Sequence, residues 1–229
     1  MQPDHVINCI GVLVKKSADD ICSAILINSY LPHFLSRLGK TIGFKLTHIS
    51  TDCVFSGTQG GYREDSFRDG DDNYARTKAL GEVINERDLT IRTSIVGPEL
   101  KQNGTGLLDW FLKQEDEIKG YTKAYWSGVT TLELAKATHE LIQQKIAGIV
   151  QLSPDEKISK YELLRLFSKI WNKKIRIVPT EDYEVDKSLV SIRKDFQYTV
   201  PGYEQMLDEL NAWMTARPGC YPHYRPREP

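Results

Sequence analysis

The chain has 229 residues, 40% of them hydrophobic, and its 30 basic and 31 acidic residues leave a net charge of -1. This length and composition predict a globular protein of one domain, or of one domain with an appendage. The two signs of charge are interspersed, which gives no indication of a surface for nucleic acid or for a membrane. No segment approaches the roughly 20 apolar residues that span a bilayer.

The amino terminus, residues 1–5, lacks the basic stretch and long apolar run of a signal peptide, so we expect a cytoplasmic protein. The cysteines are far apart and form no Cys-x-x-Cys pair, which argues against a disulfide framework or a zinc site. We expect reduced thiols at Cys9, Cys22, Cys53 and Cys220, with Cys9 and Cys53 inside apolar strands. The five histidines are scattered, and we expect no catalytic metal.

The first part of the chain alternates between strand and helix patterns. Apolar, β-rich runs predict strands at residues 5–10, 46–50 and 89–96, and the first of these is expected to be buried on both faces. Helical periodicity predicts one helix from Ser17 to Leu38, closed by Gly39 and kinked at Pro32, and a second helix at 73–86. Strand alternating with helix predicts an α/β fold with a parallel sheet.

The alternation loosens beyond Pro98, where we expect a smaller, substrate-side region. The patterns there predict helices at 106–113, 132–144, 159–171 and 203–213 and short strands at 148–152 and 175–178. We therefore divide the chain into a sheet domain (1–98), a mixed region (99–216) and an irregular, proline-rich tail (217–229).

The most informative residues are a hydroxyl at the end of a strand and a Tyr-Lys pair on the helix that follows. Thr51 ends the 46–50 strand, and the predicted helix at 73–86 carries Tyr74 and Lys78, with Asp72 among the capping candidates before it. Residues four apart share a helix face, so we expect the Lys78 charge to lower the pKa of the Tyr74 phenol, which is about 10 when free. Tyr74 then becomes a general acid that can protonate a carbonyl.

A second Tyr-x-x-x-Lys match occurs at Tyr183 and Lys187. It follows no strand with a terminal hydroxyl and lies in an acidic stretch, so we assign it to a solvated surface. The spacing therefore carries meaning only together with Thr51.

With these residues in view, the chain resembles the extended short-chain dehydrogenase/reductase superfamily, and within it the dTDP-4-dehydrorhamnose reductase group of sugar-nucleotide reductases. The matching features follow the family order: residues 3–8 as the fourth strand of a Rossmann-like sheet, Asn28, residues 50–57, Tyr74 with Lys78, and residues 92–94. Residues 125–131 and 148–153 match the later substrate-side loop and strand less sharply.

The resemblance implies a role for each matching residue. Tyr74 would be the general acid, Lys78 would bind the nicotinamide ribose, and Thr51 would hydrogen-bond the substrate carbonyl. Further cofactor-binding residues would be Asn8, Ser50, Thr93 and Ser94, and further substrate-binding residues would be Asp52 and Trp126. The implied reaction is reduction of a nucleoside-diphosphate 4-keto-6-deoxy sugar by NADPH or NADH, in the supply of deoxysugars for surface polysaccharide.

Several of these positions keep a structural alternative. Asn8 and Asn28 are equally suited to satisfying backbone groups, Asp52 to forming a turn, and a lone Trp126 to packing in a core. Arg92 is suited either to contacting a diphosphate or to packing its stem along the end of a strand.

One departure from the family is serious. Its members begin with a strand, a Gly-x-x-Gly-x-x-Gly turn and a helix that receives the dinucleotide pyrophosphate. No such motif occurs in this sequence, so we expect an N-terminally incomplete sheet whose 5–10 strand is a bare edge, and a fragment or a chain that starts at an internal Met. The residue that would select NADH or NADPH is absent with the motif.

Two other functions stay open. The first is a non-catalytic sugar-nucleotide-binding or regulatory subunit of the same fold, which the absence of the glycine turn favours. The second is a related epimerase or dehydratase, and Cys53 after Asp52 disfavours the dehydratase because that class places an Asp-Glu pair there. The expected partner is a nucleotide-sugar substrate, and a homodimer is one of the assemblies left open.

Overall fold

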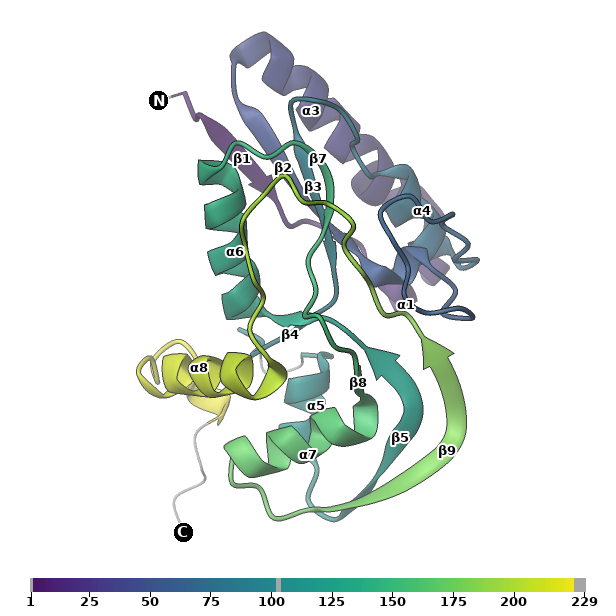
Figure 1. The fold of residues 1–229 in the computed structure, drawn as a ribbon, viewed down its shortest axis with the longest axis vertical. Coiled ribbons are helices and arrows are strands. Elements are labelled where there is room, and N and C mark those ends of the chain that lie inside the picture. Colours follow the sequence, from purple (N-terminus) through teal and green to yellow (C-terminus); the bar gives the residue numbers. More distant parts are fainter. Residues whose placement is uncertain (1, 102–103, 225–229) are drawn as a thin grey trace.

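A four-stranded parallel sheet forms the upper part of the molecule in the computed structural model, which describes residues 2–101 and 104–224 (Figure 1). Its strand order is β1 (His5–Asn8), β2 (Lys45–Thr51), β3 (Leu89–Thr93) and β7 (Gly148–Gln151). The predicted α/β fold with a parallel, Rossmann-like sheet is therefore confirmed.

The strand register brings several predicted site residues to one edge of this sheet. Asn8 of β1 lies beside His48 of β2, and Thr51 at the end of β2 lies beside Thr93 at the end of β3. In parallel sheets the ligand crevice lies outside the carboxyl ends of the strands. The ends of β1, β2 and β3 are therefore the place to look for a site.

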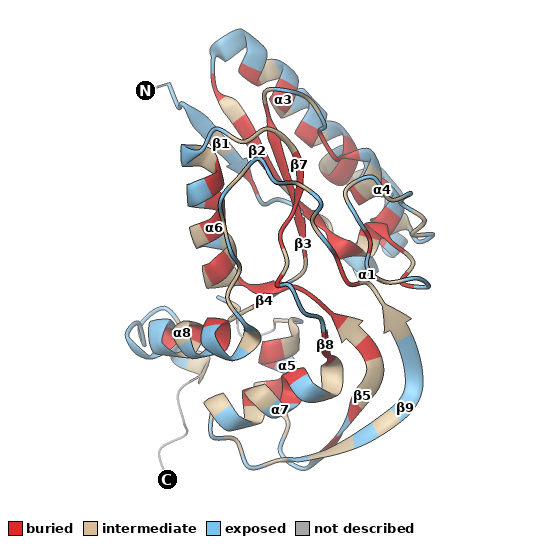
Figure 2. Ribbon diagram, viewed as in Figure 1, coloured by how far each residue is buried: buried red, intermediate tan, exposed pale blue. Residues whose placement is uncertain are grey.

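The strand β1 is an edge strand, as predicted, but it is not buried on both faces. Ile7 is 51% exposed, and Asn8 is the one residue of β1 that is buried. Burial rises sharply at the neighbouring strands, and all five residues of β3 are buried (Figure 2). The apolar run at 5–10 indicated a strand correctly, and the position of β1 at the edge of the sheet explains its exposure.

The prediction of a single helix closed by Gly39, on one face of the sheet, is wrong. The segment is divided into α1 (Val14–Asp19), α2 (Ile21–Ala24), a π-helical turn η1 (Ile25–Tyr30) and α3 (Leu31–Ile42). Pro32 lies in the first turn of α3 and lacks the N–H of a regular helix, which fits the change of helix type there. The helix ends at Gly43, which has φ 108°, a value that favours glycine.

Gly39 is a glycine for a different reason. A Cβ at this position would lie 2.6 Å from the carbonyl oxygen of Phe44, so the glycine lets the chain after α3 pack closely against the helix. The helix α4 (Asn73–Leu80) completes this face of the sheet and ends well before the predicted residue 86.

The opposite face is covered by α6 (Thr131–Gln143), whose Ala137 and Leu141 pack with Leu89, Ile91 and Val150 (Figure 1). A two-stranded parallel ribbon, β4 (Ile95–Val96) with β6 (Val129–Thr130), leads from the sheet into the lower region. There α5 (Leu107–Lys113), α7 (Lys160–Ile170) and α8 (Tyr203–Thr215) surround a second apolar core.

Two long strands in the lower region were not predicted at their observed length. β5 (Glu117–Trp126) was missed, and β9 (Arg176–Asp186) extends far beyond the predicted 175–178. The two strands pair in parallel, and β8 (Ile158–Ser159) pairs antiparallel with β5. Most residues of β9 are at least partly exposed, so the sequence shows no apolar run to indicate it.

The tail is more ordered than predicted as far as the structure describes it. A 3-10 turn, η3 (Pro222–Tyr224), brings the Tyr224 hydroxyl to Asp109 Oδ1 at 2.9 Å, and the Glu99 N–H donates to the same hydroxyl. Residues 225–229 of the predicted tail lie outside the described residues, and the division of the chain at 98 and 216 stays a prediction.

The cysteines are free thiols, as expected, but their placement differs from the prediction. Cys9 is exposed after the end of β1, and Cys53 lies in the 3-10 turn η2 (Asp52–Val54), so neither is inside a strand. Among residues 2–101 and 104–224, no helix combines the length and apolar character needed to cross a membrane.

The contact between α4 and η1 leads to a first prediction. A Cβ at Gly81, directly after α4, would lie 1.8 Å from the backbone oxygen of Asn28. Since backbone must move to accept it, we expect Gly81→Ala to lower the free energy of unfolding by roughly 1–3 kcal/mol in urea titrations.

Gly219→Ala is the matched control, because a Cβ there meets no atom within 4 Å. We expect its effect to stay within about 0.5 kcal/mol. Equal stability of the two variants would contradict the close approach of α4 to η1.

Candidate active site

Hydrogen bonds hold the helix α4, which carries Tyr74 and Lys78, at its start and in its middle. At its start the Asp72 carboxylate accepts a hydrogen bond from the Ala75 N–H (2.7 Å), the predicted cap. In its middle Thr77 accepts from the Asn28 amide (3.1 Å), and Asn28 also binds both backbone groups of Val12. Asn28 therefore has a structural role that joins η1 to α4 and to the chain after β1.

Lys78 points from α4 to the interior of the site and is only 4% exposed. Its Nζ donates to the carbonyl oxygen of Ile49 (2.7 Å) and lies 3.4 Å from His48 Nε2. Burial lowers the pKa of Lys78 to about 8, although Glu82 and Cys9 act to raise it. The side chain can therefore exchange between ammonium and amine close to neutral pH.

Tyr74 lies one turn before Lys78 and is partly buried. Burial raises the pKa of its phenol to about 12, against a hydrogen bond with Thr51 that lowers it. Lys78 is not among the groups that shift this pKa, so the prediction that the lysine lowers it is wrong for this structure. The phenol keeps its proton at neutral pH, as a proton donor requires.

Thr51, the last residue of β2, lies beside Tyr74 of α4. Its Oγ1 accepts from the Cys53 N–H (3.1 Å) and lies 3.2 Å from Asp52 Oδ1, in addition to the hydrogen bond with Tyr74. The structure thus brings Thr51 and Tyr74 together, with Lys78 one turn along α4.

Asp52 is buried beside this pair, and burial raises the pKa of its carboxyl group. The positive charges of Lys160 and Lys187 and hydrogen bonds with Thr51 and Ser94 act in the opposite direction. Ser94, predicted to bind cofactor, therefore lies against the carboxylate predicted to bind substrate.

Two lysines of this group were missed or misassigned from the sequence. Lys160 begins α7, its Nζ lies 5.1 Å from the centre of the Trp126 ring, and burial lowers its pKa to about 8. Lys187, which we assigned to a solvated surface, is partly buried, whereas Tyr183 is 52% exposed as expected. No motif marks Lys160, and the capping box of Ser159 and Glu162 shows only where α7 begins. Lys187 belongs to the second Tyr-x-x-x-Lys match, whose spacing does not indicate a contact with Asp52.

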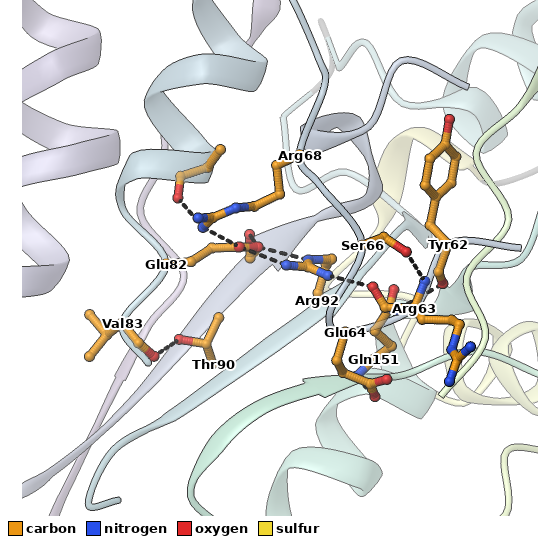
Figure 3. A network of polar contacts seen from close by, with 12 residues as sticks. Tyr62, Arg63, Glu64, Ser66, Arg68, Glu82, Val83, Thr90, Arg92 and Gln151 are labelled. Atoms are coloured by element: carbon orange, nitrogen blue, oxygen red, sulfur yellow. Dashed lines mark hydrogen bonds and ion pairs between the residues drawn. The ribbon is translucent and has the colours of Figure 1, made fainter. Parts of the chain in front are cut away.

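Ser50, Arg92 and Thr93 make contacts of a structural kind. The Ser50 hydroxyl donates to Glu82 Oε1 (2.7 Å), and Arg92 binds both oxygens of the same carboxylate at 2.8 Å (Figure 3). Arg92 is buried here and not directed at a diphosphate. The Thr93 hydroxyl donates to the carbonyl oxygen of Leu152 (2.7 Å).

Asn8 likewise has defined partners. Its Oδ1 accepts from the Ile10 N–H (3.1 Å), and its Nδ2 lies 3.2 Å from His48 Nδ1. Asn8, His48 and Lys78 therefore form a chain across the ends of β1, β2 and α4.

Lys78 and Tyr74 fit the nicotinamide-ribose part of a nicotinamide dinucleotide. Lys78 and Tyr74 stand side by side on α4 at the carboxyl ends of the strands, where hydroxyl groups of a ribose can be bound. The sequence has no glycine turn at the start of a helix for the pyrophosphate. The fit therefore concerns the nicotinamide-ribose half.

Comparison with known proteins shows the family of the chain. The family model described as the RmlD substrate binding domain matches residues 1–189. The chain belongs to this family.

Among curated relatives, the methionine adenosyltransferase 2 subunit beta of Xenopus tropicalis is 26% identical over 188 residues, which cover 75% of this chain and 55% of that protein. The chain thus spans about half the length of this relative.

Among solved structures, a hypothetical dTDP-4-dehydrorhamnose reductase from Sulfolobus tokodaii superposes with a TM-score of 0.72 at 28% identity, covering 82% of this chain and 71% of that one. The dTDP-4-dehydrorhamnose reductase from Bacillus anthracis, solved in complex with NADP, gives 0.77 at 22% identity, covering 93% and 81%. The second likeness concerns the fold alone.

The burial of Lys78 leads to a prediction about pH. Its folded-state pKa of about 8 lies below the ordinary 10.5, so the buried ammonium destabilises the folded state. This destabilisation is fully present below pH 8 and decreases between pH 8 and 10.5, as Lys78 loses its proton. We expect Lys78→Met to stabilise the fold by up to about 3 kcal/mol at pH 7, and less as the pH approaches 10.

Urea unfolding from pH 6 to 10 measures this difference, with Lys15→Met as the control at an exposed position of α1. We expect the control to change stability by less than about 0.5 kcal/mol at every pH. If Lys78→Met raises the free energy of unfolding equally at pH 7 and pH 10, burial of the Lys78 ammonium does not destabilise the fold.

Proposed function

We propose that this chain carries the proton-delivering part of an NAD(P)H-dependent reductase acting on a nucleoside-diphosphate 4-keto-6-deoxy sugar. The observation that carries the proposal is the hydrogen-bonded pair of Thr51 and Tyr74 at the end of β2, with Lys78 one turn away. Membership of the RmlD substrate-binding-domain family supports the same class of substrate.

In the proposed mechanism Thr51 and Tyr74 hold the substrate carbonyl oxygen between their two hydroxyl groups. When bound, the nicotinamide dinucleotide supplies the hydride to the carbonyl carbon. Tyr74 donates its proton to the carbonyl oxygen, which becomes the new hydroxyl group of the product. Lys78 would bind the nicotinamide ribose.

The charged groups beyond Asp52 support an anionic sugar substrate. Lys160 lies over the face of Trp126, and Lys187 acts on Asp52 from the end of β9. Cations and an aromatic ring are the groups that bind a nucleoside diphosphate, through its phosphates and its base. Trp126 itself is only 5% exposed and packs in the lower apolar core, the structural alternative for this residue. We therefore propose that Lys160 and Asp52 belong to the substrate side of the site, with Trp126 supporting Lys160 from the core.

A second candidate function is a subunit that binds a partner protein. One observation favours it: a relative of this chain is named as a subunit of a methionine adenosyltransferase. This candidate requires neither Tyr74 nor Lys78 to be reactive.

The reductase proposal predicts a specific loss in Tyr74→Phe. This variant keeps the ring and removes the donated proton, so we expect the rate of NAD(P)H oxidation with a dTDP-4-keto-6-deoxy sugar to fall at least about 100-fold. Absorbance of the reduced nicotinamide measures the rate. Tyr183→Phe is the matched control and should keep the wild-type rate, because Tyr183 is exposed on β9.

Two outcomes would count against the proposal. Undiminished turnover in Tyr74→Phe would remove Tyr74 from the mechanism. A folded wild-type chain that oxidises no NAD(P)H with the sugar nucleotide, yet forms a stoichiometric complex with a methionine adenosyltransferase in sedimentation, would favour the subunit.

A further inference from the structure

A cleft of about 760 Å³ lies in the lower region of the molecule, and we call it the distal cleft. The carboxyl ends of α5, α7 and α8, which lie together below the sheet, line it with residues such as Leu112, Trp171 and Met214 (Figure 1). The tail adds Tyr221 and Tyr224. Small-molecule sites typically occupy about 300–1,000 Å³, so the distal cleft has the size of a ligand site.

The helix α7 separates the distal cleft from the candidate active site. Its first residue, Lys160, lies over the Trp126 ring, and its last residue, Ile170, lines the cleft. A helix of 11 residues is about 15 Å long. Among the described residues that line the cleft, none belongs to the group proposed to act on the substrate carbonyl. A ligand in the cleft would therefore occupy a second site.

Aromatic side chains line the distal cleft from two elements. The Trp171 indole follows the end of α7 and packs edge-on against Phe167 of the core, with 5.8 Å between ring centres. Tyr221 and Tyr224 come from the tail, with 6.4 Å between ring centres, and the Tyr224 hydroxyl is bonded to Asp109. Because contacts with the rest of the protein hold Trp171 and Tyr224 in place, a flat aromatic ligand can stack here without first ordering the walls.

The charged groups around the distal cleft balance each other. Lys113 pairs with Asp109 at 2.6 Å. Lys173 donates to the carbonyl oxygen of Leu112 (2.9 Å) at the carboxyl end of α5, where a helix carries partial negative charge. The positive charge of Lys173 is matched by the carboxylate of Glu115, which also lines the cleft. The walls therefore give no net attraction to an ion of either sign.

The wall formed by the tail contains a ring nitrogen that lacks a hydrogen-bond partner among the residues that the structure describes. This atom is Nε2 of His223, and it is buried. A buried polar atom without a partner is unfavourable. A hydroxyl group both donates and accepts, so it can pair with Nε2 in either tautomer of the ring. The distal cleft therefore favours a ligand with a hydroxyl group beside His223.

We propose that the distal cleft is a second small-molecule site, which binds an uncharged, planar aromatic molecule with a hydroxyl group directed at His223. The aromatic walls determine the flat shape of the ligand, the balanced charges disfavour an ion, and the unpaired ring nitrogen determines the hydroxyl group. The inference goes beyond the proposed reductase function and does not depend on it.

The first test titrates a probe of this chemistry into the full wild-type chain. The probe is 2-naphthol, a flat ring system with one hydroxyl group and no charge at neutral pH. The indole N–H signal of Trp171 reports binding in ¹⁵N–¹H correlation spectra and is assigned by its loss in Trp171→Phe. We expect this signal to shift saturably. If it does not shift, or if only signals elsewhere shift, the proposal is overturned.

The second test compares charged molecules of the same shape. Naphthalene-2-sulfonate is the anion and 2-naphthylmethylammonium the cation. We expect each to bind at least about tenfold more weakly than 2-naphthol, since an ion loses its water without gaining an unpaired charge of opposite sign. Equal or tighter binding of either ion at the Trp171 signal would contradict the proposal.

The third test removes the unpaired nitrogen. His223→Phe keeps a ring in the wall, and we expect the affinity for 2-naphthol to fall about tenfold. Trp213→Phe is the matched control, because Trp213 is 38% exposed on α8, stacks on Arg217 and does not line the cleft. It should keep the wild-type affinity. An unchanged affinity in folded His223→Phe would show that the nitrogen does not contact the ligand and would overturn the proposal.

Discussion

The Glu82 carboxylate is the interaction on which the position of the candidate site depends. It is buried directly after α4 and accepts from Ser50 of β2, from Arg92 of β3 and from Arg68 of the loop before α4 (Figure 3). A buried charge is tolerated only when partners satisfy it, and removing one partner of such a pair typically costs about 3–5 kcal/mol. The network therefore fixes the end of α4 against two strands, and Lys78 with it.

Ring stacking and hydrogen bonds also hold the loop between β2 and α4 in place. The Tyr62 ring stacks on Phe55 at 4.2 Å between centroids, and the Tyr62 backbone bonds with Ser188 and Val190. Glu64 accepts from Gln151, Ser191 and Ile192. The loop is therefore a packed connection between the sheet and the segment after β9, the segment that begins with Lys187.

The sequence predicted the local parts of this site and missed the parts that depend on long-range contacts. Thr51, Tyr74 and Lys78 were found because a strand end and an i, i+4 pair are short-range patterns. Lys160 and Lys187 act on Asp52 from distant elements, and no short-range pattern indicates that contact. The strand β5 was missed because Gly120 and Ala124 occupy two of its buried positions, which weakens the apolar alternation that indicates a strand.

The direction of the pKa shift at Tyr74 shows a different limit of prediction from sequence. The spacing of Tyr74 and Lys78 was read correctly, but the effect of burial on a phenol exceeds that of neighbouring charges and cannot be estimated from spacing.

The anchoring of Glu64 also has a consequence for synthesis on the ribosome. Its partners Gln151 and Ile192 lie 87 and 128 residues further along the chain. At roughly 5–20 residues per second, the loop leaves the ribosome on the order of 10 s before the last partner exists. Thr51, Tyr74 and Lys78 are therefore translated early, but their surroundings close late, and in that interval the nascent chain offers an open sheet edge to chaperones.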